Sequence, residues 1–133
     1  MPHLTLEYSA NLADATSIGQ LCKSLAVCLD AQRDGDKRVY PLGGIRVRAV
    51  ECQQYCVADG RPDAAFLHGI LKIGAGRSDA VKKATGDALF AVIDRHFSDV
   101  FERRGIALSL EINEFNEAGT WKHNSLHARL KAG

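Results

Sequence analysis

The sequence predicts an α+β fold of two layers, in which a β-α-β unit occurs twice and forms a four-stranded sheet with both helices on one face. Two observations carry this prediction. Apolar residues alternate or recur at helical spacing in the order strand, helix, strand, and then in the same order again. In addition, residues 4–14 and 69–79 both run from a strand through a polar turn to an aspartate near a helix start. Since 133 residues with 46% apolar side chains suffice for one core but not for two, we expect a single domain over residues 1–133.

The first β-α-β unit opens the chain. Apolar side chains alternate with polar ones over residues 4–8, which predicts a strand. A stripe of apolar residues at helical spacing follows, and it predicts a helix from Ile18 to about Gln32. Alternation returns over residues 45–50 and predicts the second strand. Because a β-α-β crossover joins parallel strands, we expect these two strands to be parallel.

The second unit repeats this order. The largely apolar segment 64–73 predicts a third strand, and a stripe over residues 81–100 predicts one long helix that Gly105 terminates. Alternation over residues 106–113 predicts the fourth strand. The tail, residues 120–131, is expected to form a short helix or a short strand, and its pattern does not choose between them.

Polar and glycine-rich segments predict the helix starts and the turns. Asn11 or Asp14 is the candidate cap of the first helix, and Ser78 is the candidate cap of the second. The charged run 33–38 predicts a solvated turn.

The sheet face opposite the helices has no covering element in this arrangement. We expect much of that face to be apolar, and a large exposed apolar face usually marks an interface between proteins. The sequence therefore predicts an oligomer.

Composition and motifs exclude several classes of function. Seventeen Lys and Arg against sixteen Asp and Glu leave a net charge of +1, which gives no electrostatic reason to bind nucleic acid or a membrane. Without a long apolar run or an export signal we expect a cytoplasmic protein whose four cysteines are free thiols.

His123 and His127 share a helical face but lack a third ligand, so we expect no metal. Residues 74–76, Gly-Ala-Gly, lack a complete phosphate-binding pattern, and we expect no bound nucleotide.

Three residues are the candidates for chemistry. Removal of Met1 would give Pro2 a secondary amine at the start of an ordered strand, and burial or nearby cations lower the pKa of such an amine from its usual range of roughly 7.7–8.0. Pro2 is therefore a candidate base near pH 7, and a nucleophilic role through an iminium is an alternative. Arg46 opens the second strand, and Arg77 lies in the glycine-rich turn before the second helix. Because guanidinium groups bind carboxylates through paired hydrogen bonds, we expect the two arginines to hold a dianionic organic acid.

Several motifs together resemble those of a known family. They are Pro2-His3 with Glu7-Tyr8-Ser9 and Asn11, Pro-Leu-Gly-Gly-Ile-Arg-Val-Arg at 41–48, Ala58-Asp59-Gly60, Leu-Lys-Ile-Gly-Ala-Gly-Arg-Ser at 71–78, Ala-Leu-Ser-Leu-Glu-Ile at 107–112, and Lys122-His123-Asn124 with His127. In these motifs the chain resembles the 5-carboxymethyl-2-hydroxymuconate isomerase family of the tautomerase superfamily, whose members use an amino-terminal proline. The resemblance spans nearly the whole chain in order, and the Lys-Ile-Gly-Ala-Gly-Arg-Ser run is its most specific part.

This resemblance implies a tautomerase-like homotrimer with active sites at or near subunit boundaries. It also implies a cofactor-free 1,3 proton shift in homoprotocatechuate catabolism, in which a small carboxylate-bearing dienol, 5-carboxymethyl-2-hydroxymuconate, becomes its 2-oxo isomer. Carried over by position, Pro2 is the base, while Arg46 and Arg77 bind carboxylates and polarise the 2-oxygen. Two alternatives stay open: another proline-dependent tautomerase of a 2-hydroxydienoate or an arylpyruvate, and a non-catalytic trimeric binding protein of the same fold.

Overall fold

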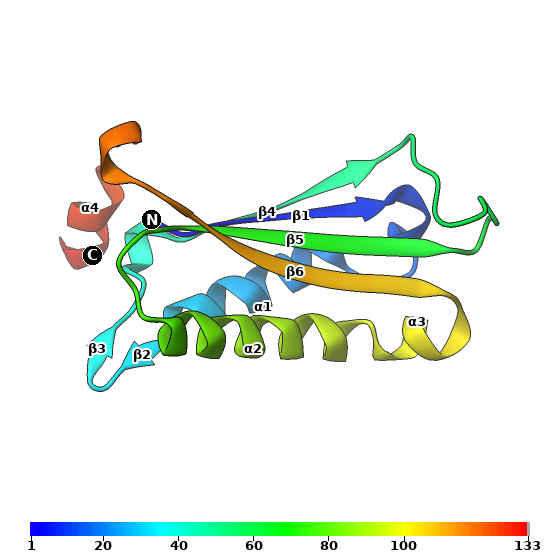
Figure 1. The fold of residues 1–133 in the computed structure, drawn as a ribbon, viewed down its shortest axis with the longest axis horizontal. Helices are drawn as coiled ribbons and strands as arrows, with labels where there is room; N and C mark the ends of the chain where they lie inside the picture. The colour runs from blue at the N-terminus through cyan, green and yellow to red at the C-terminus, as the bar shows by residue number, and fades with distance from the viewer. Residues whose placement is uncertain (133) are drawn as a thin grey trace.

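The computed structural model describes residues 1–132, and its strands and helices follow the predicted order (Figure 1). The long strands are β1 (His3–Ser9), β4 (Arg46–Cys52), β5 (Ala65–Gly74) and β6 (Ile106–Phe115). The helices are α1 (Ile18–Asp30), α2 (Asp79–His96), α3 (Ser98–Arg103) and α4 (Leu126–Ala132). Smaller elements are the strands β2 (Arg33–Asp34) and β3 (Lys37–Arg38) and the 3-10 turns η1 (Ala10–Leu12), η2 (Leu42–Gly44) and η3 (Glu117–Gly119).

The four long strands form one mixed sheet in the order β4-β1-β5-β6. β1 and β4 are parallel, β5 and β6 are parallel, and β1 runs antiparallel to β5. Each β-α-β unit thus contributes one parallel pair, and the two units meet at β1 and β5. Figure 1 shows α1 and α2 on the same face of this sheet, where α1 packs on β4 and α2 packs on β6. The predicted α+β fold with its duplicated unit is confirmed.

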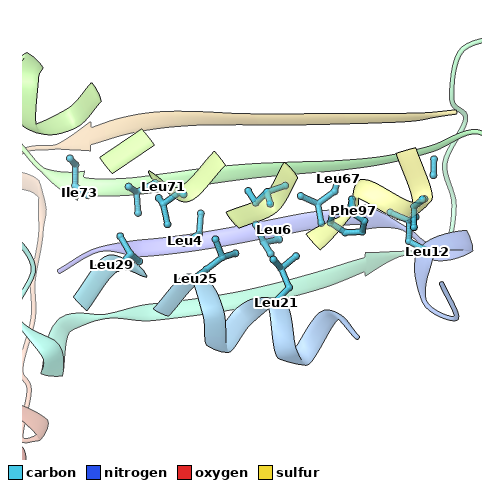
Figure 2. Packing of buried hydrophobic residues seen from close by; sticks show 14 of the residues in the cluster. Leu4, Leu6, Leu12, Leu21, Leu25, Leu29, Leu67, Leu71, Ile73 and Phe97 are labelled. Carbon is cyan, nitrogen blue, oxygen red and sulfur yellow. The ribbon is translucent and has the colours of Figure 1, made fainter. Parts of the chain in front are cut away.

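The core lies between the sheet and the two long helices (Figure 2). Its fully buried members include Leu4, Leu6, Leu21, Leu25, Leu29, Leu67, Leu71, Ile73, Leu89, Ile93 and Phe97. They recur at every second residue on the strands and at every fourth on the helices, which is the spacing that places side chains on one face. Burial of each leucine stabilises the fold by about 1.5–3 kcal/mol relative to exposure. Because Leu4 is fully buried, the start of β1 is held firmly in the centre of the sheet.

The predicted cap of the first helix is wrong. Ser17, and neither Asn11 nor Asp14, caps α1, since its side chain accepts a hydrogen bond from the backbone N–H of Gln20 at 3.2 Å. The side-chain amide of Asn11 instead donates a hydrogen bond to the carbonyl of Ala64 at 2.8 Å. It therefore ties the end of β1 to the segment that enters β5.

The long helix predicted over residues 81–100 is divided into α2 and α3. The division falls at Phe97, where the backbone leaves helical geometry with φ −101° and ψ 12°. Phe97 is fully buried and Val100 is 2% exposed, so the bend keeps both side chains in the core. None of the helices within residues 1–132 is long and apolar enough to cross a membrane.

The remaining predictions concern the charged run and the tail. Residues 33–38 are exposed, as predicted, but they pair with themselves as the β2-β3 hairpin instead of forming a simple turn. Gly35 turns this hairpin with φ 61°, a conformation that glycine adopts without steric cost. In the tail, residues 126–132 form the helix α4, which settles the choice between helix and strand.

The sheet face opposite the helices is mainly polar, so the expectation of an apolar outer face is wrong. Its outward-facing residues are His3, Thr5, Glu7, Ser9, Arg46, Arg48, Val50, Cys52, Phe66, His68, Ile70, Lys72, Gly74, Ala107, Ser109, Glu111, Asn113 and Phe115. The physical reason is the alternation itself, because the leucines of β1 and β5 all occupy the inward row. His68 even joins a polar cluster on this face, with Nδ1 2.6 Å from Ser109 Oγ and Nε2 3.0 Å from Glu111 Oε1.

Candidate active site

The two β-α-β units bring four strand ends to one edge of the sheet. β1 and β4 begin at this edge, whereas β5 and β6 end there, since the two parallel pairs run in opposite directions. In this register His3 lies opposite both Arg46 on β4 and Lys72 on β5. Pro2 directly precedes β1, and Arg77 follows the end of β5 by three residues. Figure 1 shows the N-terminus, α4 and the β2-β3 hairpin at this same end of the molecule.

Pro2 is buried at this edge, and its surroundings are rigid. Its carbonyl oxygen accepts a hydrogen bond from the backbone N–H of Arg46 at 3.0 Å. Met1 lies against Gly44, where an added Cβ would be 3.3 Å from Met1 Cγ. With Met1 attached, the Pro2 nitrogen is an amide and has no basic lone pair. Removal of Met1 would turn the same nitrogen into a secondary amine.

The surroundings of the terminal amine favour its neutral form. The pKa of the Met1 amino group is lowered first by burial, and then by the positive charges of Lys122, Arg77 and Arg46. The carboxylate of Glu117 acts in the opposite direction and raises the pKa. An amino group at the position of the Met1 nitrogen is therefore more readily neutral than an ordinary chain terminus.

Arg46 is fixed by the turn that precedes its strand. Its Nη1 donates to the carbonyl oxygens of Gly43 at 2.9 Å and Ile45 at 3.1 Å. Gly43 and Gly44 belong to the 3-10 turn η2, and both are buried. The side chain of Arg46 is thus bound to the turn, while its backbone N–H pairs with the carbonyl of Pro2.

Arg77 is held by two backbone carbonyls and an aromatic ring. Its Nη1 donates to Gly74 at 3.1 Å, and its Nη2 donates to Val39 at 3.1 Å. The guanidinium carbon lies 4.8 Å from the centre of the Tyr40 ring, which is within the range of a cation–π contact. Tyr40 is itself fully buried, and its hydroxyl lies 2.9 Å from Thr85 Oγ1.

Neither arginine has an acidic partner. Within residues 1–132, no carboxylate forms an ion pair with Arg46 or Arg77. Backbone carbonyls orient both guanidinium groups without neutralising their charge, so both retain the capacity to bind an anion. The arrangement can therefore hold a carboxylate-bearing molecule next to the N-terminal nitrogen.

Asn124 is a residue of this edge to which the sequence pattern assigned no role. Its Nδ2 donates to the Gly43 carbonyl at 2.9 Å and lies 3.5 Å from the sulfur of Met1. Its Oδ1 accepts from the backbone N–H of Leu126 at 2.6 Å, at the start of α4. An asparagine just before a helix is a common cap, and this signal, beside the Lys122-His123-Asn124 motif, could have found it.

The sequence of the chain matches a model of the 5-carboxymethyl-2-hydroxymuconate isomerase family over residues 2–130. The chain belongs to this isomerase family. A curated relative, the 5-carboxymethyl-2-hydroxymuconate Delta-isomerase of Escherichia coli, is 37% identical over 131 residues, which are 98% of this chain and 100% of the relative. The crystal structure of a 5-carboxymethyl-2-hydroxymuconate isomerase from Deinococcus radiodurans R1 is 52% identical, with a TM-score of 0.89, and the match covers 97% of this chain and 93% of that one.

More distant structures share the fold alone. A fused 4-OT, described as a symmetric trimer, has a TM-score of 0.61 at 18% identity, and the match covers 91% of this chain and 93% of that one. This similarity shows that the fold also occurs outside the isomerase family. It agrees with the tautomerase-like architecture that the motifs imply.

A hollow of about 770 Å³ in this isomerase-family chain lies away from the edge described above, between α2 and β6. Its charged side chains have partners, Lys82 with Glu114, Lys83 with Asp87 and Glu111 with His68, and so offer little free charge to a ligand. A hollow of about 450 Å³ adjoins Arg77 and is lined by the hairpin and the start of α2. The edge with Arg46 and Arg77 is the better candidate for an anion site, because free charge rather than volume favours an anionic ligand. Within residues 1–132, no three His, Cys, Asp or Glu side chains lie close enough to share a metal ion.

Proposed function

We propose that this chain isomerises 5-carboxymethyl-2-hydroxymuconate without a cofactor, with Pro2 as the base and Arg46 and Arg77 as substrate-binding cations. The observation that carries the proposal is the convergence of the start of β1, the start of β4 and the end of β5 at one edge. This convergence supports a site with one amine and two unpaired guanidinium groups. Membership of the isomerase family supports the substrate.

The proposed reaction is a 1,3 proton shift from oxygen to carbon. After Met1 is removed, the Pro2 nitrogen takes the proton from the hydroxyl on C2 of the dienol. The electron pair of that O–H bond becomes the C2=O double bond as the C2=C3 double bond opens, and C3 receives a proton from the prolinium. The product is the 2-oxo isomer, and Pro2 returns to its neutral form. A positioned proton carrier accelerates such a step by roughly 10²–10⁴-fold.

The arginines act on the charge that forms between the two proton transfers. Loss of the hydroxyl proton leaves negative charge on the 2-oxygen, and a fixed cation beside it stabilises that charge more than it stabilises the neutral dienol. Arg46 and Arg77 are both preorganised by backbone carbonyls, so they need little rearrangement as the charge develops. The substrate carboxylates supply the remaining negative groups for these cations to bind.

The proposal includes a homotrimer of single domains that each span residues 1–133, located in the cytoplasm. The symmetric trimer of the fused 4-OT with the same fold supports the assembly. Trp121 also supports it, because an aromatic side chain that is 89% exposed in one chain is a typical anchor of an interface. The four free cysteines support a reducing compartment.

The test is the ultraviolet loss of the dienol in the presence of protein whose intact mass proves that Met1 is absent. We expect a large acceleration over buffer. The matched control is the same chain with one additional residue before Pro2, which blocks the amine and should abolish the acceleration. Equal activity of the blocked chain would exclude Pro2 as the base, and a lack of activity in the Met-free chain would exclude the proposed reaction.

A further inference from the structure

We propose that Lys122 is a third carboxylate-binding cation of the site and that it selects dienols with three carboxylates over those with two. This inference rests on the proposed function, because it concerns the same site. The proposed substrate carries three carboxylates, two from the muconate chain and one from the carboxymethyl group. Arg46 and Arg77 supply two guanidinium groups, so a further cation at the same edge would give the third carboxylate a partner of its own.

The segment that contains Lys122 is anchored at the site edge. Two residues further along, Asn124 donates to the Gly43 carbonyl at 2.9 Å and lies 3.5 Å from the sulfur of Met1. His127 packs so closely on the same turn that a Cβ added to Gly43 would lie 2.8 Å from its Nδ1. These contacts hold the backbone after β6 beside the start of β1, and they bring Lys122 to the same edge.

Lys122 has only a weak partner among the residues that the structure describes. Its Nζ lies 3.7 Å from Oε1 of Glu117, and the two side chains are 47% and 86% exposed. An ion pair of this length in water is readily exchanged, because solvent and salt screen it. A substrate carboxylate can therefore replace Glu117 without breaking a buried contact.

The charge of Lys122 already acts on the terminal amine. After burial, it is the largest cause that lowers the pKa of the Met1 amino group, ahead of Arg77 and Arg46. This agrees with an ammonium group near the Met1 nitrogen, one residue before Pro2. The long flexible stem of lysine suits a cation that must follow a pendant carboxymethyl group, whereas the two arginines are fixed by backbone carbonyls.

Binding of unreactive carboxylates tests this inference without any turnover. Propane-1,2,3-tricarboxylate and the dicarboxylate glutarate are titrated calorimetrically into Met-free wild type, Lys122→Met and the control Lys23→Ala, an exposed lysine in the middle of α1. We expect Lys122→Met to weaken tricarboxylate binding by about 10–100-fold and glutarate binding by less than about twofold. Lys23→Ala should change neither, and Lys122→Arg should retain most of the preference. Equal losses for both ligands, or no loss, would overturn the assignment.

Kinetics then separate this inference from the proposed function. The ratio of kcat/KM for 5-carboxymethyl-2-hydroxymuconate to that for 2-hydroxymuconate, which has two carboxylates, should fall by about 10–100-fold in Lys122→Met. If wild type turns over the tricarboxylate dienol and this ratio is unchanged, the role of Lys122 is wrong while the reaction stands. If wild type turns over neither dienol but the binding preference depends on Lys122, the reaction is wrong while the cation site stands.

Discussion

The backbone N–H of Arg46 donates to the carbonyl oxygen of Pro2 at 3.0 Å, and this bond begins the parallel pairing of β1 with β4. Two residues that are far apart in the sequence are thereby held together by the main chain alone. Side-chain changes at Arg46 should therefore remove its charge without displacing Pro2. Single substitutions can therefore test the charges of the site one at a time.

The first prediction concerns the two arginines. Arg46→Ala and Arg77→Ala are each expected to lower kcat/KM for the dienol by about 100-fold or more, because each removes a fixed cation from the developing oxyanion. The oligomeric state, measured by light scattering, should not change. The matched control is Arg103→Ala, an exposed arginine of α3 at the far end of the sheet. Wild-type kinetics in either site variant would show that the wrong cation has been chosen.

The second prediction concerns the support beneath Arg77. Tyr40→Phe keeps the ring under the guanidinium group but leaves the fully buried Thr85 hydroxyl without its partner at 2.9 Å. We expect the free energy of unfolding in urea to fall by about 1–3 kcal/mol, with little change in kcat/KM. The double variant Tyr40→Phe/Thr85→Val should recover most of this stability, since both polar groups are then gone. Failure of the double variant to recover would mean that the hydroxyl pair is not the cause.

The third prediction concerns the close contact between η2 and α4. Gly43→Ala places a Cβ 2.8 Å from His127 Nδ1, so the tail must shift away from the turn that carries Arg46. We expect a loss of both stability and kcat/KM, and partial recovery in Gly43→Ala/His127→Ala. The control is Gly19→Ala in α1, where a Cβ meets nothing within 4 Å. That helical change should stabilise the chain by about 0.5–1 kcal/mol in the same urea titration.

The fourth prediction concerns pH. Burial and the charges of Lys122, Arg77 and Arg46 lower the pKa of the Met1 amino group. We expect the same cations to lower the pKa of the Pro2 amine once Met1 is removed, and only the neutral amine is a base. The rise of kcat/KM with pH should therefore be centred below the ordinary α-amino value of 8.0. Lys122→Met removes a positive charge, which raises the pKa and moves this rise to higher pH. Glu117→Gln removes a negative charge and moves it to lower pH.

The opposite signs make these two variants controls for each other. Shifts in the same direction, or a profile centred above 8.0 in the wild type, would contradict a buried terminal base. The measurement is kcat/KM for the dienol from pH 5 to pH 9 at constant ionic strength, because screening weakens both effects at high salt.

Much of the architecture was predictable because it depends on local periodicity. Alternation over residues 4–8 and 106–113 predicted β1 and β6, and Ser78 was correctly predicted to cap α2, since its side chain accepts from the backbone N–H of Val81. Local patterns gave a wrong prediction where a side chain forms its hydrogen bond with a residue far away in the sequence. Asn11 looks like a helix cap but bonds Ala64 instead. No sequence pattern predicts the bend at Phe97, because the bend depends on how α3 packs against the core.

By itself, the sequence determined the order of strands and helices and the family. It also determined Pro2, Arg46 and Arg77 as candidate site residues. Each of these results depends on a local spacing or a contiguous motif. Only the tertiary structure decided that the segment with Lys122 and Asn124 returns to the edge where Pro2 lies. This placement depends on the antiparallel pairing of β1 with β5, which joins the two parallel pairs. The ends of β5 and β6 therefore lie beside the starts of β1 and β4. No local pattern records which strand ends will meet, because pairing between distant segments is chosen by burial of the whole core.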